Sequence, residues 1–177
     1  MLRLTLDMDD VLANTHEKLV DIVLADFSTT LNREDFQTRG LRELLHPKQL
    51  SKLHKIMNEP GFFADIQVKE GAIETVYTLS KYYELFVATA CMEFPNSFRD
   101  KFDWLKKHFP FIPWTNVVFC GYKSIIRSDY LIDDHVRNLA AFQGKGILFS
   151  SPHNLRETAY KRVSSWNEVS ELFLHSI

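Results

Sequence analysis

The chain has 177 residues, of which 45% are hydrophobic and 25% charged, a composition typical of a folded protein with one sizeable core. Its formal net charge of −2 provides no field that would gather nucleic acid or an anionic membrane surface. We therefore expect a small-molecule partner, with no nucleic acid polymer and no membrane.

The first predicted strand is Leu2–Leu6, a short apolar run at the start of the chain. From Thr15 to about Gly71 the pattern is helical only, with an apolar stripe over 19–27 and a second helix that starts at Pro47. We interpret 15–71 as a helical cap inserted after the first strand. An insert at that point would arch over the crevice in which open α/β sheets bind ligands.

Short apolar runs and amphipathic helices alternate after the insert. Helical stripes begin at Phe98 and at Trp166, and four more strands are predicted at 85–89, 117–120, 130–132 and 146–149. This alternation predicts an α/β fold, with a Rossmann-like parallel sheet as its core. The core domain would comprise 1–14 and 72–177, and the small helical cap would be its only insertion.

Carboxylates crowd at the ends of two predicted strands. Asp7, Asp9 and Asp10 follow the first strand, and Asp133 and Asp134 follow the strand "YLI". Like charges raise one another's pKa unless they share a cation, and the carboxyl ends of parallel strands face one edge of a sheet. Oxygen ligands of this kind suit Mg²⁺, so the sequence predicts a magnesium site at that edge.

Two further residues lie near the carboxyl ends of predicted strands. Thr89 ends the run "ELFVAT" and offers a hydroxyl group to a phosphate oxygen, and Lys123 follows "VVFCGY" and offers a positive charge. The order Asp-x-Asp, Thr, Lys, Asp-Asp is far more specific than any of its members. Together these residues indicate phosphate chemistry.

This order resembles the haloacid dehalogenase superfamily of Mg²⁺-dependent phosphatases, whose four motifs are matched by "DMDDVLA", "FVATA", Lys123 in "GYKS", and "YLIDD". Within that superfamily the chain is similar to the 5'(3')-deoxyribonucleotidases. The similar segments are "GFFADIQVKEGAIETV", "RDKFDWLKKHF", "KSIIRSDYLIDDH", "GILFSSPHN" and "SSWNEV". The region from Thr15 to about Glu59 matches only loosely.

The resemblance implies a mechanism through an aspartyl-phosphate. Asp7 would attack phosphorus, and Asp9 would protonate the leaving oxygen and then deprotonate the hydrolytic water. Mg²⁺ would be bound by Asp7, by the backbone carbonyl of Asp9 and by Asp134. Asp133 would support these ligands without contacting the ion.

The resemblance also implies how the substrate is held. Thr89, the amide of Ala90, Lys101 and Lys123 would bind the transferred phosphoryl group. The substrate would be a nucleoside monophosphate, with deoxyribonucleotides favoured, and the enzyme a hydrolase of the 5'-nucleotidase type.

Three residues depart from the family pattern, and two of them, Thr15 and Ala90, bear on the substrate more than on the reaction. Asp10 stands where the family usually has glycine, and we expect its charge to face solvent or a helix N-terminus. Thr15 replaces an aromatic residue of the base pocket, and Ala90 replaces a serine. Phe62 and Phe63 are the candidates for stacking on a base.

Other interpretations stay open at this point. Asp133 and Asp134 could cap a helix near His135, the Phe62–Phe63 pair could be core packing, and His153 in "SPHN" could be a structural hydrogen-bonding residue. Another small phosphoester is an alternative substrate. A non-catalytic phospho-receiver module is a further alternative, but receivers place their acid pair early in the chain, whereas here the pair is the last motif.

The remaining predictions concern compartment and assembly. Cys91 and Cys120 lie among apolar residues, which indicates reduced core thiols in a cytoplasmic protein. No apolar run reaches the ~18 residues of a membrane span, and we expect no signal peptide. The seven histidines have no zinc-enzyme spacing. A homodimer, the preferred base and sugar, and the roles of Asp10 and His153 are left open.

Overall fold

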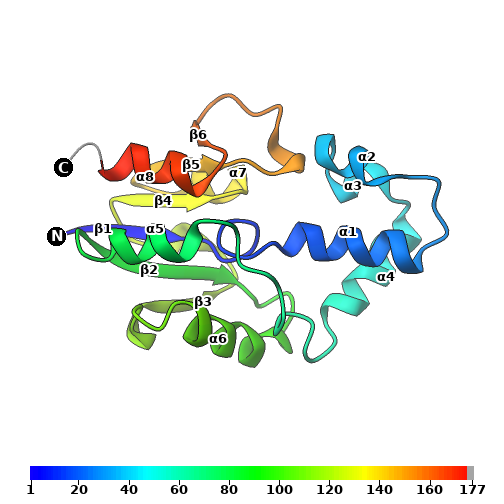
Figure 1. The fold of residues 1–177 in the computed structure, drawn as a ribbon, viewed down its shortest axis with the longest axis horizontal. Coiled ribbons are helices and arrows are strands. Elements are labelled where there is room, and N and C mark those ends of the chain that lie inside the picture. Colours follow the sequence, from blue (N-terminus) through cyan, green and yellow to red (C-terminus); the bar gives the residue numbers. More distant parts are fainter. Residues whose placement is uncertain (175–177) are drawn as a thin grey trace.

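The computed structural model describes residues 1–174, which build a six-stranded parallel sheet flanked by helices (Figure 1). The strand order is β3-β2-β1-β4-β5-β6, and every neighbouring pair is parallel. The strands are β1 (Leu2–Leu6), β2 (Tyr83–Ala90), β3 (Val117–Cys120), β4 (Tyr130–Asp133), β5 (Lys145–Phe149) and β6 (Lys161–Val163).

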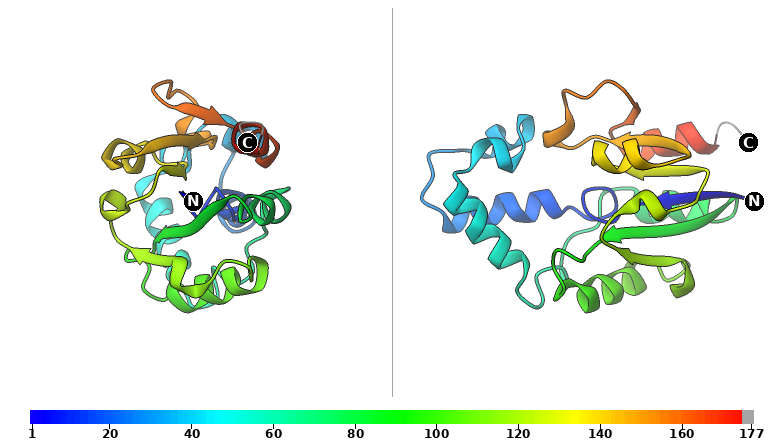
Figure 2. Two further views of the ribbon diagram at one scale, coloured as in Figure 1. Left: turned by 90° about the vertical axis from the view of Figure 1, so that its left-hand side faces the viewer. Right: turned by 180° about the vertical axis from the view of Figure 1, so that it is seen from behind.

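Helices connect the strands and cover the sheet. They are α1 (Thr15–Asp26), α2 (Arg33–Thr38), α3 (Leu41–Leu44), α4 (Pro47–Met57), α5 (Ala72–Leu79), α6 (Ser97–His108), α7 (Val136–Ala141) and α8 (Trp166–Leu174). Three short 3₁₀ turns complete the set: η1 (Trp114–Asn116), η2 (Lys123–Ile125) and η3 (Pro152–Asn154). Helices α5 and α8 lie together on one face, and α7 lies on the other (Figures 1 and 2).

Strand β1 lies between β2 and β4, and its last three residues are buried. Leu4 and Leu6 are fully buried, and the strand pairs with β2 on one side and β4 on the other. The β1–β4 pairing continues past the strand, where the Asp7 amide donates to the Ile132 carbonyl at 2.9 Å. The carboxyl ends of β1, β2 and β4 therefore meet at one edge.

The predicted α/β class and parallel sheet are confirmed. Two strands have the predicted bounds, and the other three are longer by one to three residues. Strand β6 was not predicted, because Val163 is the only buried residue among its three and no apolar run marks it.

Helices α1 to α4 lie beyond the carboxyl ends of the strands, at the right of Figure 1. The segment leaves and returns at neighbouring points: the Asn14 amide donates to Gln67 O at 2.8 Å, and the Lys69 amide donates to Leu12 O at 2.8 Å. Its apolar residues share one hydrophobic cluster with the sheet, including Val20 and Phe36. The predicted helix start at Pro47 is confirmed.

Cys91 and Cys120 are free and buried, and burial raises the pKa of Cys91 to about 11. Both thiols are thus in the protonated, unreactive form near neutral pH. Within residues 1–174, no helix has the length and apolar character to cross a membrane.

Candidate active site

The carboxyl edge of the sheet brings the predicted site residues together from separate elements. Asp7 directly follows β1, Thr89 lies at the end of β2, and Asp133 ends β4. Lys101 extends from α6, and Lys123 begins η2 after β3. All five are buried, which places several charges in a region from which water is largely excluded.

Lys123 is the central cation of this edge. Its Nζ lies 2.6 Å from Asp7 Oδ1 and 2.6 Å from Asp133 Oδ2, and its side chain is only 1% exposed. Burial alone would lower the pKa of Lys123, but the two carboxylates hold that pKa above its ordinary value. Burial raises the pKa of Asp7 to about 7 against the opposing attraction of Lys123.

Asp9 has a different set of partners. Lys101 Nζ lies 2.5 Å from Asp9 Oδ2 and donates to Thr89 Oγ1 at 3.1 Å, and the Thr15 hydroxyl donates to Asp9 Oδ1 at 2.8 Å. Burial would raise the pKa of Asp9, but the attraction and hydrogen bonds of Lys101, with the bond from Thr15, hold it below its ordinary value. The pKa values of Asp7 and Asp9 are thus shifted in opposite directions by their different partners.

Asp134 has one carboxylate oxygen without a hydrogen-bond partner among the described residues. Its Oδ1 is buried and accepts no hydrogen bond from residues 1–174. Burial, with repulsion from Asp10, Asp7 and Asp133, raises the pKa of Asp134 well above its ordinary value. Carboxylate oxygens of Asp7, Asp133 and Asp134 all lie within 4.8 Å of one another, so this donor set fits a hard divalent cation.

Asp133 holds Lys123 on one side and residues at the start of α7 on the other. Its Oδ1 accepts the His135 amide at 2.8 Å at the start of α7, and Asn138 Nδ2 donates to both of its oxygens at 2.9 and 3.0 Å. The N-cap residue of α7 is His135, and no side chain among the described residues caps the helix, so the helix-capping interpretation is wrong for both Asp133 and Asp134. Lys123 also bonds to Asp133, so the Asp133 oxygens have few lone pairs left for a metal ion. This agrees with the prediction that Asp133 does not contact the ion.

Asp10 adopts the left-handed conformation that favours glycine, with φ of 57°. Its Oδ1 accepts the amide of His16 at 2.7 Å in the first turn of α1. The charge thus faces a helix N-terminus, one of the two positions expected from the sequence. This hydrogen bond explains how aspartate is tolerated at a glycine-like position.

The aromatic pair is buried beside the lysines. Phe62 is 6% and Phe63 1% exposed, and their rings make an edge contact with centroids 4.8 Å apart. Lys101 Nζ lies 4.4 Å from the centre of the Phe63 ring, so Phe63 borders the charged site, whereas Phe62 contacts Lys18. Stacking of either ring on a base stays a prediction.

Sequence reasoning missed the direct bond from Thr15 to Asp9 and the contact of two histidines with Asp134. His153 Nε2 lies 3.5 Å and His135 Nε2 3.8 Å from Asp134 Oδ2. Thr15 stood out only as a departure from a family pattern. The histidines are 18 positions apart in the sequence, and only the return of the chain through β5 joins them.

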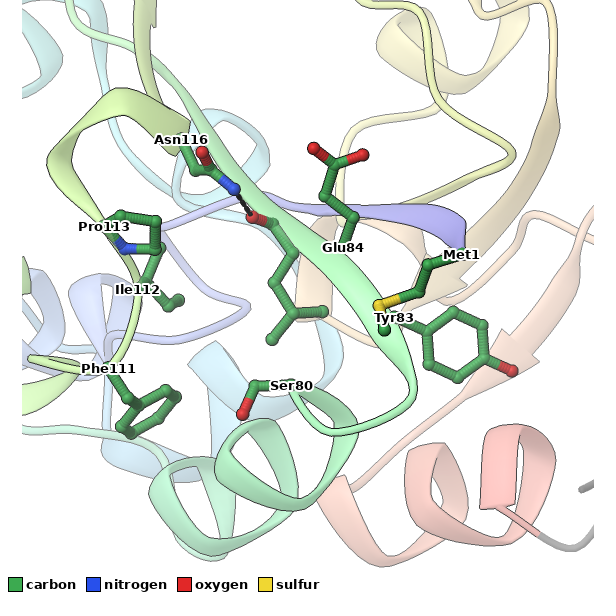
Figure 3. A pocket seen from close by; sticks show the side chains of 9 residues that line it. Met1, Ser80, Tyr83, Glu84, Phe111, Ile112, Pro113 and Asn116 are labelled. Atoms are coloured by element: carbon green, nitrogen blue, oxygen red, sulfur yellow. Dashed lines mark hydrogen bonds between the residues drawn. The ribbon is translucent and has the colours of Figure 1, made fainter.

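The pocket in Figure 3 lies elsewhere. It has a volume of about 210 Å³ and is lined by residues that include Met1, Tyr83 and Glu84, at the amino ends of β1 and β2. Beside it the amide of Asn116 donates to the Leu85 carbonyl at 2.8 Å. This hollow is at the opposite end of the strands from Asp7, so it takes no part in the site.

Comparisons with known proteins indicate one family. The family model described as 5' nucleotidase, deoxy (pyrimidine), cytosolic type C matches residues 1–176. A relative from Staphylococcus epidermidis is 39% identical over 171 residues, which cover 97% of this chain and 95% of the relative. The 5'(3')-deoxyribonucleotidase of Bacillus subtilis is 34% identical over 171 residues, covering 97% and 98%.

Solved structures support the same fold. A haloacid dehalogenase-like hydrolase from Streptococcus pneumoniae superposes with a TM-score of 0.67 at 12% identity, covering 98% of each chain. A haloacid dehalogenase-type hydrolase from Bacillus subtilis, solved with bound magnesium, has a TM-score of 0.58 at 14% identity and also covers 98% of each chain. At such identities the likeness concerns the fold.

Proposed function

Because the chain belongs to the family of cytosolic type C 5'(3')-deoxyribonucleotidases, phosphoric monoester hydrolases with a haloacid dehalogenase-like fold, we propose that it uses Mg²⁺ and a phosphorylated Asp7 to hydrolyse deoxyribonucleoside monophosphates. The observation that carries this proposal is the buried, unpartnered Oδ1 of Asp134 within reach of Asp7. Buried polar atoms without a partner are rare in folded proteins, and a bound cation would satisfy this one.

Asp7, Asp134 and the backbone carbonyl of Asp9 would hold the Mg²⁺. When bound, the ion neutralises the charge that would otherwise keep an anionic nucleophile from a phosphate dianion. The clustered carboxylate oxygens support this assignment, as does the magnesium bound by the structural neighbour from Bacillus subtilis. Asp133 holds Lys123 and the start of α7 and would stay outside the ligand set.

Asp7 acts as the nucleophile. One of its carboxylate oxygens forms a bond to phosphorus while the bond from phosphorus to the sugar oxygen breaks in line. Lys123, 2.6 Å from Asp7 Oδ1, orients the carboxylate and offers positive charge to the transferred group. Thr89 and the amide of Ala90, at the end of β2, would bind its remaining oxygens.

Asp9 moves the proton. It gives a proton to the leaving sugar oxygen, and it then takes one from the water that attacks the aspartyl-phosphate, releasing phosphate and free Asp7. In the absence of substrate the Lys101 ion pair favours the charged form of Asp9. An incoming phosphate would compete for Lys101, which would free Asp9 to take up its proton.

The segment 15–71 would act as the cap that selects the substrate and excludes water. Its helices α1 to α4 face the carboxyl edge of the sheet, and Phe63 in its returning stretch lies against Lys101. We place the base of the nucleotide on this side. Another small phosphoester remains the alternative substrate.

A substrate panel tests the proposal. The protein, freed of metal and then supplied with Mg²⁺, is assayed for phosphate release from 5'- and 3'-monophosphates of ribo- and deoxyribonucleosides and from simple sugar phosphates. We expect release from deoxyribonucleotides, and loss of activity on chelation and in Asp7→Asn. Phosphate release by Asp7→Asn at the wild-type rate would refute the nucleophile, and a preference for sugar phosphates would refute the substrate.

A further inference from the structure

Two histidines lie next to Asp134 Oδ2, but neither has a part in the proposed reaction. Nε2 of His153 and of His135 lie 3.5 and 3.8 Å from Asp134 Oδ2, and their rings stack with centroids 4.5 Å apart. One ligand atom from each of the three residues lies within 4.8 Å of the other two. This is a donor set of two imidazoles and one carboxylate.

Such a set suits zinc better than magnesium. Zinc binds imidazole nitrogen and carboxylate oxygen at about 2.0–2.2 Å, so the ligand atoms of a tetrahedral site are roughly 3.4 Å apart. The observed 3.5 and 3.8 Å between each nitrogen and Asp134 Oδ2 are close to that separation. Magnesium favours oxygen ligands throughout, so it has little use for the imidazoles.

The surroundings of His153 prepare it for this role. Its Nδ1 lies 3.0 Å from Ser151 Oγ, and its Nε2 lies 3.1 Å from the Asp134 carbonyl oxygen. A metal on Nε2 places the ring proton on Nδ1, where Ser151 Oγ accepts it, as the supporting hydrogen bond of a metal-bound histidine. The Asp134 carbonyl stays satisfied because Asn154 Nδ2 donates to it at 2.8 Å.

Access is also suitable. The His135 and His153 side chains are 49% and 30% exposed, while Asp134 is 2% exposed. The two imidazoles are therefore accessible to an ion from solvent. The Asp134 carboxylate is buried beneath them, next to the proposed magnesium ligands.

We propose that Asp134, His135 and His153 form a zinc site that shares Asp134 with the magnesium site and thereby opposes magnesium binding. The sharing rests on the proposed function, whereas the zinc site itself does not. Two divalent ions on one carboxylate repel each other and divide its charge, so zinc weakens magnesium binding. By reciprocity, magnesium weakens zinc binding by the same factor.

The binding test is competition for Zn²⁺ with a chromophoric chelator, using the full chain freed of metal. We expect one Zn²⁺ per chain for the wild type and an affinity at least about tenfold lower in His135→Gln and in His153→Gln. His46→Gln removes an exposed histidine outside the cluster and should bind as the wild type. Equal zinc affinity in the wild type and both cluster variants would overturn the proposal.

A second arm separates the zinc site from the proposed function. Repeated with increasing Mg²⁺, the competition should give a falling zinc affinity in the wild type, and unchanged zinc affinity would overturn the shared carboxylate. Phosphate release is measured separately in zinc-free buffer. An absence of phosphate release in that buffer would contradict the proposed function. The zinc affinity of His135→Gln would still test the zinc site.

Discussion

Asp9 is held by two groups from two parts of the chain. Thr15 at the start of α1 donates to one oxygen, and Lys101 on α6 pairs with the other while also donating to Thr89. The carboxylate to which we assign the proton transfer is therefore fixed in direction before substrate arrives. Fixed orientation of an acid–base group is a main source of its catalytic effect.

Replacing Thr15 by valine should lower kcat by about three- to tenfold, because one hydrogen bond worth about 1 kcal/mol no longer orients Asp9. KM should change little, since Thr15 contacts the acid and not the phosphate-binding lysines. Thr15→Ser keeps the hydroxyl and is the matched control. Steady-state kinetics with the best substrate measure the effect, and equal kcat in the two variants would contradict it.

The two buried lysines should differ in their effect on stability. Lys123→Met leaves Asp7 and Asp133 without their shared cation and should lower the free energy of unfolding by about 3 kcal/mol. Lys101→Met should cost less, because Asp9 is 29% exposed and can be hydrated. Urea unfolding without metal compares the two, and a larger loss in Lys101→Met would show that the burial argument fails.

The sequence predicts the position of some site residues, whereas the position of others depends on how the chain folds. Asp7, Thr89, Lys123 and Asp134 follow predicted strands, so strand ends alone placed them at one edge. The partner of Asp9 at Thr15 could not be predicted, because it depends on the tight turn after β1 in which Asp10 is left-handed. Local spacing does not encode such a reversal.

At the scale of elements, one of the contacts between the segment 15–71 and the rest of the chain is especially close. Gly40, between α2 and α3, packs against His153 so tightly that a Cβ at position 40 would lie 2.7 Å from the His153 Cβ. Its φ of −71° is ordinary, so glycine is needed there for space and not for conformation. This contact lets the cap approach the loop after β5.

Gly40→Ala should therefore hold the cap away from the site and lower kcat/KM by about tenfold or more, since small misplacements of closing elements cost large factors in rate. The free energy of unfolding should fall by about 1–3 kcal/mol, because the added Cβ overpacks the contact with His153. Thr38→Ala, an exposed position at the end of α2, is the control. A kcat/KM equal to that of Thr38→Ala would contradict the cap contact.

Strands and helices with an apolar sequence pattern were predictable. Those that form only because a neighbouring element pairs or packs with them were not. Strands β1 and β3 were predicted to the residue because their apolar runs begin and end sharply. Strand β6 has one buried residue, Val163, and exists because β5 offers it an edge with which to pair. The short helices α2 and α3 likewise depend on capping and tertiary packing more than on periodicity.

Across the whole molecule, the clustered carboxylates link metal binding to stability. Without a cation, Asp7 and Asp134 carry charge in a buried region, which disfavours the folded state. A ligand that binds only the folded chain stabilises it according to its concentration relative to the dissociation constant.

At one hundred times its dissociation constant, Mg²⁺ should stabilise the chain by about 2.7 kcal/mol and raise Tm by roughly 5–10 °C. Asp134→Asn should abolish this increase, and it should raise Tm in the absence of metal by removing a buried charge. Asp26→Asn, on an exposed position of α1, should respond to Mg²⁺ as the wild type does. Thermal unfolding with and without Mg²⁺ decides, and an Mg²⁺-induced increase retained in Asp134→Asn would exclude this carboxylate as a ligand.

The central claim is that Asp7, carried by the middle strand to the shared edge, forms the covalent intermediate. Acid quenching of Asp9→Asn during turnover of a deoxyribonucleotide, followed by peptide mass spectrometry, tests it directly, because this variant should accumulate the intermediate. We predict one phosphoryl group on Asp7. A phosphoryl group on any other residue, or continued phosphate release with Asp7 unmodified, would contradict the account.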